Sequence, residues 1–295
     1  AAYGLVGEFD PQVALDQISL TINPSFRYSS SGEDQARFRQ DTIRELLSYA
    51  MGCMMGRYSL DEPGVVLSTA GNVDFDPQRY TSFAADDDGI VPLTDTDWFS
   101  DDACNRFIEF LSVVWGKDRV EENVHCVAQA LEPASEQSSQ HVIRKYFCTA
   151  FFAHHLQTYN QRPIYWLFSS GRHRAFQCLV YVHRIHRGTV ARIRNEYLIP
   201  LMAKIQSRME HLQADIDYAR AQKWTARRNA LQNELKIRQK QHIELLAYDE
   251  EMRHIADYEI VLDLDDGIKA NYGKLGSLLA EVRTVHGKTV KKYEA

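Results

Sequence analysis

Residues 163–182 read PIYWLFSSGRHRAFQCLVYV and decide the centre of the fold. Two runs rich in aromatic and β-branched residues, 163–169 and 176–182, flank a Ser-Gly turn signal. Runs of this kind on either side of a short glycine-containing loop are typical of a β-hairpin. The loop carries Arg172, His173 and Arg174. The stretch therefore predicts a β-hairpin with a basic tip, and a two-stranded ribbon is one way into a DNA groove.

On the C-terminal side of this hairpin, the sequence turns helical over two long segments. Apolar residues recur there at alternating steps of four and three, the spacing of a coiled-coil seam, at Ile205, Met209, Leu212, Ile216 and Ala219. We predict an antiparallel helical hairpin with arms at 189–221 and 225–258, the first kinked by Pro200. Packing between the arms explains the apolar stripe without a cofactor.

On the N-terminal side, apolar residues at helical spacing predict helices at 33–55, 101–116, 117–131 and 140–159. The aspartate-rich segment 65–97 lacks periodicity and has no ordered metal-ligand pattern, so it predicts a solvated or partner-facing loop. Ser29 to Gly32 predict another loop. Strand-like residues occur at 18–22 and 260–262, and 263–267 predict a turn with helix-capping chemistry, followed by a short helix through Leu278 and Val282.

These elements predict a mainly α fold with a small β component. We expect a helical N-terminal domain with an acidic loop at 1–160, a basic β-hairpin region at 161–188, and a helical spacer hairpin with a C-terminal segment at 189–295. The chain has 295 residues, of which 44% are hydrophobic and 25% charged, as in ordinary globular proteins. Its apolar runs are too short to span a membrane, and its first residues lack the features of a secretory signal.

The charge is distributed unevenly along the chain. Residues 1–140 carry 9 Lys and Arg against 24 Asp and Glu, a net charge of −15, whereas residues 141–295 carry a net charge of +9. The segment 162–194 holds seven arginines, three histidines and no acid. Because the arginine guanidinium suits phosphates and base edges, we predict nucleic-acid contact by Arg162, Arg172, His173, Arg174, Arg184, Arg187, Arg192 and Arg194. The alternative is docking onto an acidic partner, including the chain's own acidic half.

The sequence contains few motifs that indicate catalysis, cofactor binding or metal binding. The common nucleotide-binding and hydrolase motifs are absent. The five cysteines are widely spaced in apolar segments, which favours reduced thiols in an intracellular protein over a disulfide framework or a zinc site. Asn23-Pro24-Ser25-Phe26 is similar to the Asn-Pro-Pro-Tyr/Phe loop of amino-group DNA methyltransferases, but Ser25 replaces the second proline. We interpret it as a turn, and we predict neither catalytic nor metal-binding residues.

Several short motifs together resemble one protein family. They are CMMGRYSLD at 53–61, RPIYWLFSSG at 162–171, YVHR at 181–184, TVARIR at 189–194, LDLDDG at 262–267 and NYG at 271–273. Their order and combination are similar to the C-terminal part of the PglX (BrxX) proteins, the adenine-specific DNA methyltransferases of BREX phage-defence systems. The resemblance runs from about residue 15 to residue 285.

This resemblance implies that the chain is a fragment of a longer protein. In that family the S-adenosylmethionine and Asn-Pro-Pro-Tyr motifs lie upstream, so the chain alone is not expected to be catalytic or to bind a cofactor. It would serve as a target-recognition and spacer module that holds double-stranded DNA in the cytoplasm. Expected partners are its own methyltransferase domain, other BREX components and acidic DNA-mimicking phage inhibitors, with no membrane. The alternative is a protein-interaction module that assembles the BREX complex.

Overall fold

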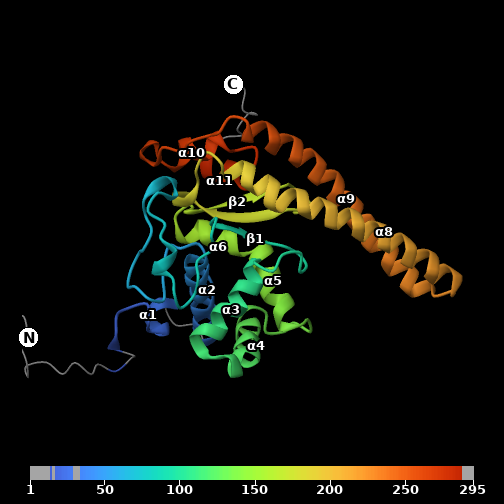
Figure 1. The fold of residues 1–295 in the computed structure, drawn as a ribbon. Coiled ribbons are helices and arrows are strands. Elements are labelled where there is room, and N and C mark those ends of the chain that lie inside the picture. Colours follow the sequence, from blue (N-terminus) through green and yellow to red (C-terminus); the bar gives the residue numbers. More distant parts are fainter. Residues whose placement is uncertain (1–13, 15–16, 29–33, 288–295) are drawn as a thin grey trace, which may run out of the picture.

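The computed structural model describes residues 14, 17–28 and 34–287 (Figure 1). Its helices are α1 Pro24–Tyr28, α2 Asp34–Met54, α3 Ala103–Trp115, α4 Val120–Leu131, α5 Ser139–Thr149, α6 Phe151–Thr158, α7 Thr189–Arg192, α8 Ile199–Ala221, α9 Thr225–Ala256, α10 Ile268–Lys274 and α11 Val282–His286. Its strands are β1 Ile90–Pro92, β2 Tyr165–Ser169 and β3 Gln177–Tyr181. The chain is therefore mainly helical with one small sheet, as its sequence predicts.

The predicted β-hairpin forms the centre of the fold. β2 and β3 pair antiparallel with Tyr165 opposite Tyr181, and β1 adds to the other side of β3, so the order is β1-β3-β2. Tyr165 stacks on His155 of α6 on one face, whereas Trp166 contacts Tyr272 of α10 on the other. Because helices cover both faces, the strands are apolar except for Ser169 and Gln177, which pair at one end of β2 and β3. The hairpin is thus a buried core element, and only its connecting loop is free to meet a ligand.

The helices that precede β2 in the chain form a layer on one side of the sheet, below it in Figure 1. α2, α3 and α4 match the predicted helices at 33–55, 101–116 and 117–131 closely. The predicted single helix at 140–159 is two helices, α5 and α6, which meet at Ala150. Near this break, the carbonyl oxygen of Cys148 accepts a hydrogen bond from Arg174 Nη1 at 3.2 Å, so the loop of the β-hairpin packs against the helix junction.

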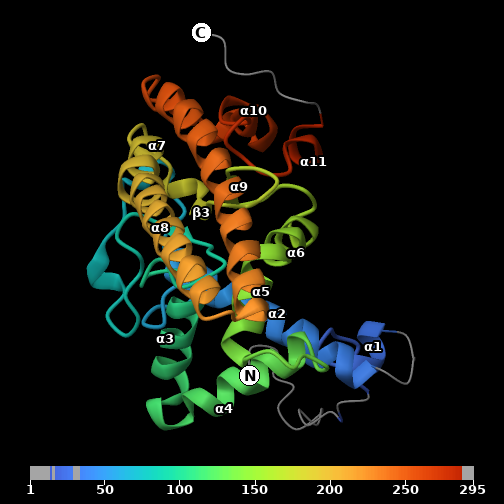
Figure 2. The ribbon, with the colours of Figure 1, turned by 90° about the vertical axis from the view of Figure 1, so that its right-hand side faces the viewer.

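The predicted helical hairpin is confirmed. Its first arm runs through α7, a π-helical stretch at Ile193–Leu198 and α8, and its second arm is α9. Pro200 has no N–H to donate to the carbonyl four residues before it, which explains the wide π turns beside it. The seam residues Ile205, Leu212, Ile216 and Ala219 are buried, whereas Met209 is half-buried. The hairpin extends well beyond the rest of the chain in Figure 1, and Figure 2, seen from the side of its tip, shows α8 and α9 side by side.

Two strand predictions are wrong. Residues 18–22 contain a turn that leads into α1, and residues 260–262 form no strand. The predicted turn at 263–267 is correct, because the Asp263 side chain accepts a hydrogen bond from the Asp265 N–H at 3.0 Å. The helix predicted through Leu278 and Val282 is wrong as well: α10 ends before Leu278, and α11 begins at Val282. The predicted loop at 29–32 lies outside the described residues.

A single hydrophobic cluster joins buried residues from Leu47 to Val285, and it includes all three strands. It contains members of each of the three predicted segments. Because these segments share one core, its packing does not test the domain boundaries at 160 and 188, which stay predictions. None of the helices that the structure describes is both long enough and apolar enough to cross a membrane.

Candidate nucleic-acid interface

The basic loop at 170–176 is held in place by one acidic residue of α9. Glu244 accepts hydrogen bonds from the Ser170 hydroxyl at 2.7 Å, the His173 N–H at 2.7 Å and the Ala175 N–H at 3.2 Å. The loop also closes on itself, because the Ser170 N–H donates to the Phe176 carbonyl oxygen at 3.0 Å. A single carboxylate thus fixes the backbone of the loop, and the sequence contained no signal that Glu244, 70 residues downstream, has this role.

Two backbone conformations in the loop depend on residue type. Gly171 has a φ of +133°, and a Cβ atom there would lie 3.2 Å from the Glu244 carboxylate. Arg174 has a φ of +47°, a left-handed conformation that is uncommon for residues other than glycine, asparagine and aspartate. The hydrogen bond from Arg174 to Cys148 holds that arginine against α5. The backbone of the loop is therefore held in one conformation.

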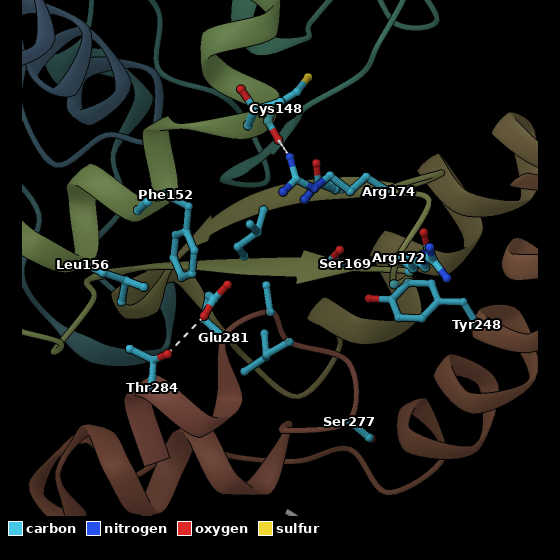
Figure 3. Close-up of a pocket in the computed structure, with 18 of the residues that line it drawn as sticks. Cys148, Phe152, Leu156, Ser169, Arg172, Arg174, Tyr248, Ser277, Glu281 and Thr284 are labelled. Carbon is cyan, nitrogen blue, oxygen red and sulfur yellow. Dashed lines mark hydrogen bonds between the residues drawn. The ribbon is translucent and has the colours of Figure 1, made fainter. Parts of the chain in front are cut away.

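At the base of the loop lies a cavity of about 810 Å³, between the α5–α6 junction, α9 and the C-terminal segment (Figure 3). Arg172 and Arg174 line one part of it. Glu281, which accepts a hydrogen bond from the Thr284 hydroxyl at 3.0 Å, lines another. A phosphate inside the cavity would meet both arginines and this carboxylate. The arrangement therefore favours contact at the exposed outer face of the loop over anion binding within the cavity.

The predicted arginines do not form one patch. Arg172, His173 and Arg174 lie at one end of the β2–β3 pair, and Arg162 and Arg187 lie beyond its other end. Five residues of β-strand separate these groups by about 17 Å. The side chains of Arg162, Arg172, His173 and Arg187 are exposed, and they form no hydrogen bond or ion pair with other residues in the described ranges. The structure therefore offers two separate basic positions.

Arg184 does not belong to a nucleic-acid interface. Its side chain is 0% exposed, and its guanidinium lies 3.7 Å from the centre of the Phe75 ring. Arg184 Nε donates to Asn72 Oδ1 at 2.8 Å, and its two terminal nitrogens donate to the Asp86 and Asp87 carbonyl oxygens. The prediction for Arg184 is wrong because this arginine ties the acidic loop to the end of β3.

Arg192 and Arg194 are engaged by neighbouring acids. Arg194 forms a bidentate pair with Asp249 of α9, at 2.7 and 3.1 Å, and both side chains are half-buried. Arg192 forms an exposed ion pair with Glu196 one turn later, at 3.2 Å. An exposed pair of this kind contributes little and can exchange for a phosphate, whereas the bidentate pair holds the π-helical stretch Ile193–Leu198 on α9. Arg194 is thus a structural residue in this conformation.

The acidic loop is partly buried rather than fully solvated. Asp88 accepts a hydrogen bond from the Tyr197 hydroxyl at 3.0 Å, and Asp95 pairs with Arg238 of α9 at 2.9 Å. Burial, reinforced by the neighbouring Asp86, raises the pKa of Asp88 to about 8. Part of the acidic half therefore contacts the chain's own basic half. The uneven charge distribution left this contact open as an alternative to nucleic-acid binding.

The remaining candidates have structural roles. Asn23 caps α1: its Oδ1 accepts from the Ser25 N–H at 3.1 Å, and its carbonyl oxygen accepts from the Arg27 N–H at 3.0 Å. Both acceptors are therefore engaged by the first turn of α1, so this Asn-Pro-Ser-Phe segment begins a helix. All five cysteines are free thiols. Within the described part of the chain, no group of His, Cys, Asp or Glu could hold a metal ion.

Two adenine-specific methyltransferases are similar to the chain along most of its length. BrxX from Escherichia coli O9:H4 (strain HS) is 43% identical over 282 residues, which cover 92% of this chain and 23% of BrxX. The resemblance predicted from the sequence motifs is confirmed. PglX from Lacticaseibacillus casei (strain Zhang) is 37% identical over 275 residues, which cover 92% of this chain and 21% of PglX. The chain thus spans less than a quarter of the length of BrxX and PglX. No protein-family model matches it.

Proposed function

We propose that the chain is the C-terminal DNA target-recognition and spacer module of a larger adenine-specific DNA methyltransferase. In this proposal the catalytic domain lies outside the chain and uses S-adenosylmethionine there to methylate host DNA in a BREX defence system in the cytoplasm. Similarity to BrxX and PglX supports the proposal, and so does the lack of methyltransferase motifs among these 295 residues.

The observation that carries the proposal is the constrained basic loop. Glu244 satisfies the donors of the loop backbone, so the side chains of Arg172 and His173 stay available at the surface. A preorganised loop loses little conformational entropy when it binds. Arg172 can therefore contact a phosphate or a guanine edge at small ordering cost. Acidic DNA-mimicking phage proteins would compete for the same loop.

A titration of the chain with duplex DNA at two salt concentrations tests this function. We expect binding that weakens as salt rises, because cations on the protein displace counterions from DNA. Arg172→Glu with Arg174→Glu should weaken binding at least tenfold. The matched control is Lys117→Glu with Arg119→Glu, two exposed cations between α3 and α4, which should leave binding unchanged. No binding at low salt, or equal losses in both double variants, would contradict the proposal.

A second candidate function is a protein-docking module that assembles the defence complex. One observation favours it: the end of α3 exposes Val113, Val114 and Trp115 together. Adjacent exposed apolar side chains often mark protein contacts. If this face is the functional one, Trp115→Ser should abolish binding to the catalytic domain or to another BREX protein, and it should leave DNA binding intact.

A further inference from the structure

The tip of the α8–α9 hairpin combines exposed aromatic and basic side chains. Tyr218 is 58% exposed and Trp224 is 44% exposed, and their rings pack edge to face with centroids 5.7 Å apart. The Arg227 guanidinium lies over the Trp224 ring, 5.4 Å from its centre. Coiled-coil packing does not require this arrangement, because the seam residues Ile216 and Ala219 already fill the interface between the arms.

Charge at the tip has one sign. Residues 218–233 include no Asp or Glu and carry Arg220, Lys223, Arg227 and Arg228. The neighbouring acids are Asp217, which pairs with Arg220 at 3.8 Å, and Glu234, which pairs with Arg208 at 2.9 Å. Lys223 and Arg227 are exposed and form no ion pair with any residue that the structure describes. The tip therefore presents at least two free cations at the outer end of the hairpin.

The hairpin holds this tip away from the rest of the chain (Figure 1). Among the described residues, its outermost hydrogen bonds to the body are made by Lys204 of α8, to the Trp98 carbonyl oxygen, and by Arg238 of α9, to Asp95. At 1.5 Å per helical residue, the tip lies about 20–25 Å beyond these contacts. That length is about two-thirds of a turn of B-form DNA, so the tip can reach a different part of a duplex from the body.

We propose that this tip is a second DNA-contacting site, which binds the phosphate backbone of duplex DNA independently of the loop at 170–176. Lys223 and Arg227 contact phosphates, and the Tyr218–Trp224 pair positions Arg227. Charge complementarity favours DNA over an apolar protein partner, since Arg227 lies over the Trp224 ring and Lys223 precedes Trp224 in the chain. Contacts of this kind position a protein on DNA without reading its sequence. In this proposal the hairpin binds DNA at its tip in addition to acting as a spacer.

The test compares two double variants of the full chain, using a 30-base-pair duplex and the dependence of binding on salt. Each phosphate contact contributes about −0.9 to the slope of log K against log salt concentration. Lys223→Gln with Arg227→Gln should therefore reduce the slope by about 2, to the same extent for every DNA sequence. The control, Lys236→Gln with Lys240→Gln, removes two exposed lysines from the middle of α9 and should leave the slope unchanged.

Trp224→Ala should weaken DNA binding severalfold, because Arg227 loses the ring against which it packs. It should leave most of the salt-dependence slope, because the cations remain. Unchanged binding in the tip variant overturns the proposal, and so does an equal loss in the control. Loss of an acidic protein partner without loss of DNA affinity overturns it as well. If the tip variant loses DNA affinity and the Arg172→Glu with Arg174→Glu variant does not, the result supports the tip site and contradicts the loop site. If only the loop variant loses affinity, the result supports the proposed function alone.

Discussion

At the scale of single residues, the structure separates arginines that look alike in sequence. Arg172 and Arg187 are exposed, Arg194 is paired with Asp249, and Arg184 is buried among carbonyl oxygens. All of them fall in one acid-free run of 33 residues, 162–194. Composition predicts the sign of charge along a segment, but the partners of Arg194 and Arg184 lie 55 to 112 positions away. A run of like charges is therefore evidence for a basic region and not for a single surface.

Glu244 should be the residue on which the order of the basic loop most depends. Glu244→Gln keeps the side-chain size but replaces one acceptor oxygen by an NH₂ group that faces donors. We expect the free energy of unfolding to fall by about 1–3 kcal/mol, because partly buried donors lose hydrogen bonds to a charged acceptor. Urea unfolding measures this loss. Glu250→Gln, on the exposed Glu250–Arg253 pair of the same helix, is the control, and it should change stability by less than about 0.5 kcal/mol.

His155 should make stability depend on pH. Its Nε2 accepts hydrogen bonds from the Ile164 and Tyr165 N–H groups, both at 3.1 Å, and burial lowers its pKa from 6.5 to about 3. The unfolded chain therefore binds a proton between pH 6.5 and pH 3 that the folded chain does not. Stability from this group is complete above pH 6.5 and falls as pH decreases, by up to about 1.4 kcal/mol per pH unit.

Thermal unfolding between pH 7 and pH 4 measures this dependence. His155→Gln keeps an acceptor for the two N–H groups but cannot be protonated, so it should lose most of the slope in that range. His141→Gln, at an exposed position on α5, should keep the slope of the parent chain. A His155→Gln variant with the same pH dependence as the parent would show that other groups are responsible.

At the scale of elements, periodicity predicts long amphipathic helices well and short segments poorly. The pattern in α8 spans several turns, so one misplaced residue such as Met209 does not hide the seam. The strand-like residues at 18–22 and 260–262 number five and three, too few for a period to be distinguished from chance. Neither segment finds a neighbouring strand in the fold. The β2–β3 pair is predicted correctly because the two runs are close in sequence and one turn brings them together.

The helical hairpin should open locally before the sheet does. Leu212 is 0% exposed, and beyond Lys204 the two arms of the hairpin contact mainly each other. Leu212→Ala should cost about 2–5 kcal/mol locally, as removal of a buried leucine side chain usually does. Hydrogen exchange of amides in 206–235 should become much faster, and that of β2 and β3 should not change. Equal acceleration in the strands would mean that hairpin and sheet unfold as one unit.

At the scale of the whole molecule, Arg184 connects segments that are about 100 residues apart. It binds Asn72, Asp86 and Asp87 from the end of β3, so it closes the acidic loop over the sheet. Arg184→Ala leaves these acceptors unsatisfied and opens a cavity beside Phe75. We expect the free energy of unfolding to fall by about 2–5 kcal/mol, because the loss of a large buried side chain leaves a cavity and unpaired acceptors. Arg187→Ala, at an exposed position, should change it by less than about 0.5 kcal/mol. Chemical denaturation of both variants measures the contrast.

The sequence by itself determined the fold class, the β-hairpin, the helical hairpin and the family resemblance, because these follow from local periodicity and from the order of short motifs. Only the tertiary structure decided which arginines are free, that Glu244 organises the loop, and that the acidic half partly covers the basic half. The same holds for the reach of the hairpin tip. These features depend on contacts between residues far apart in the chain, and one sequence does not specify which distant side chains meet when the core closes.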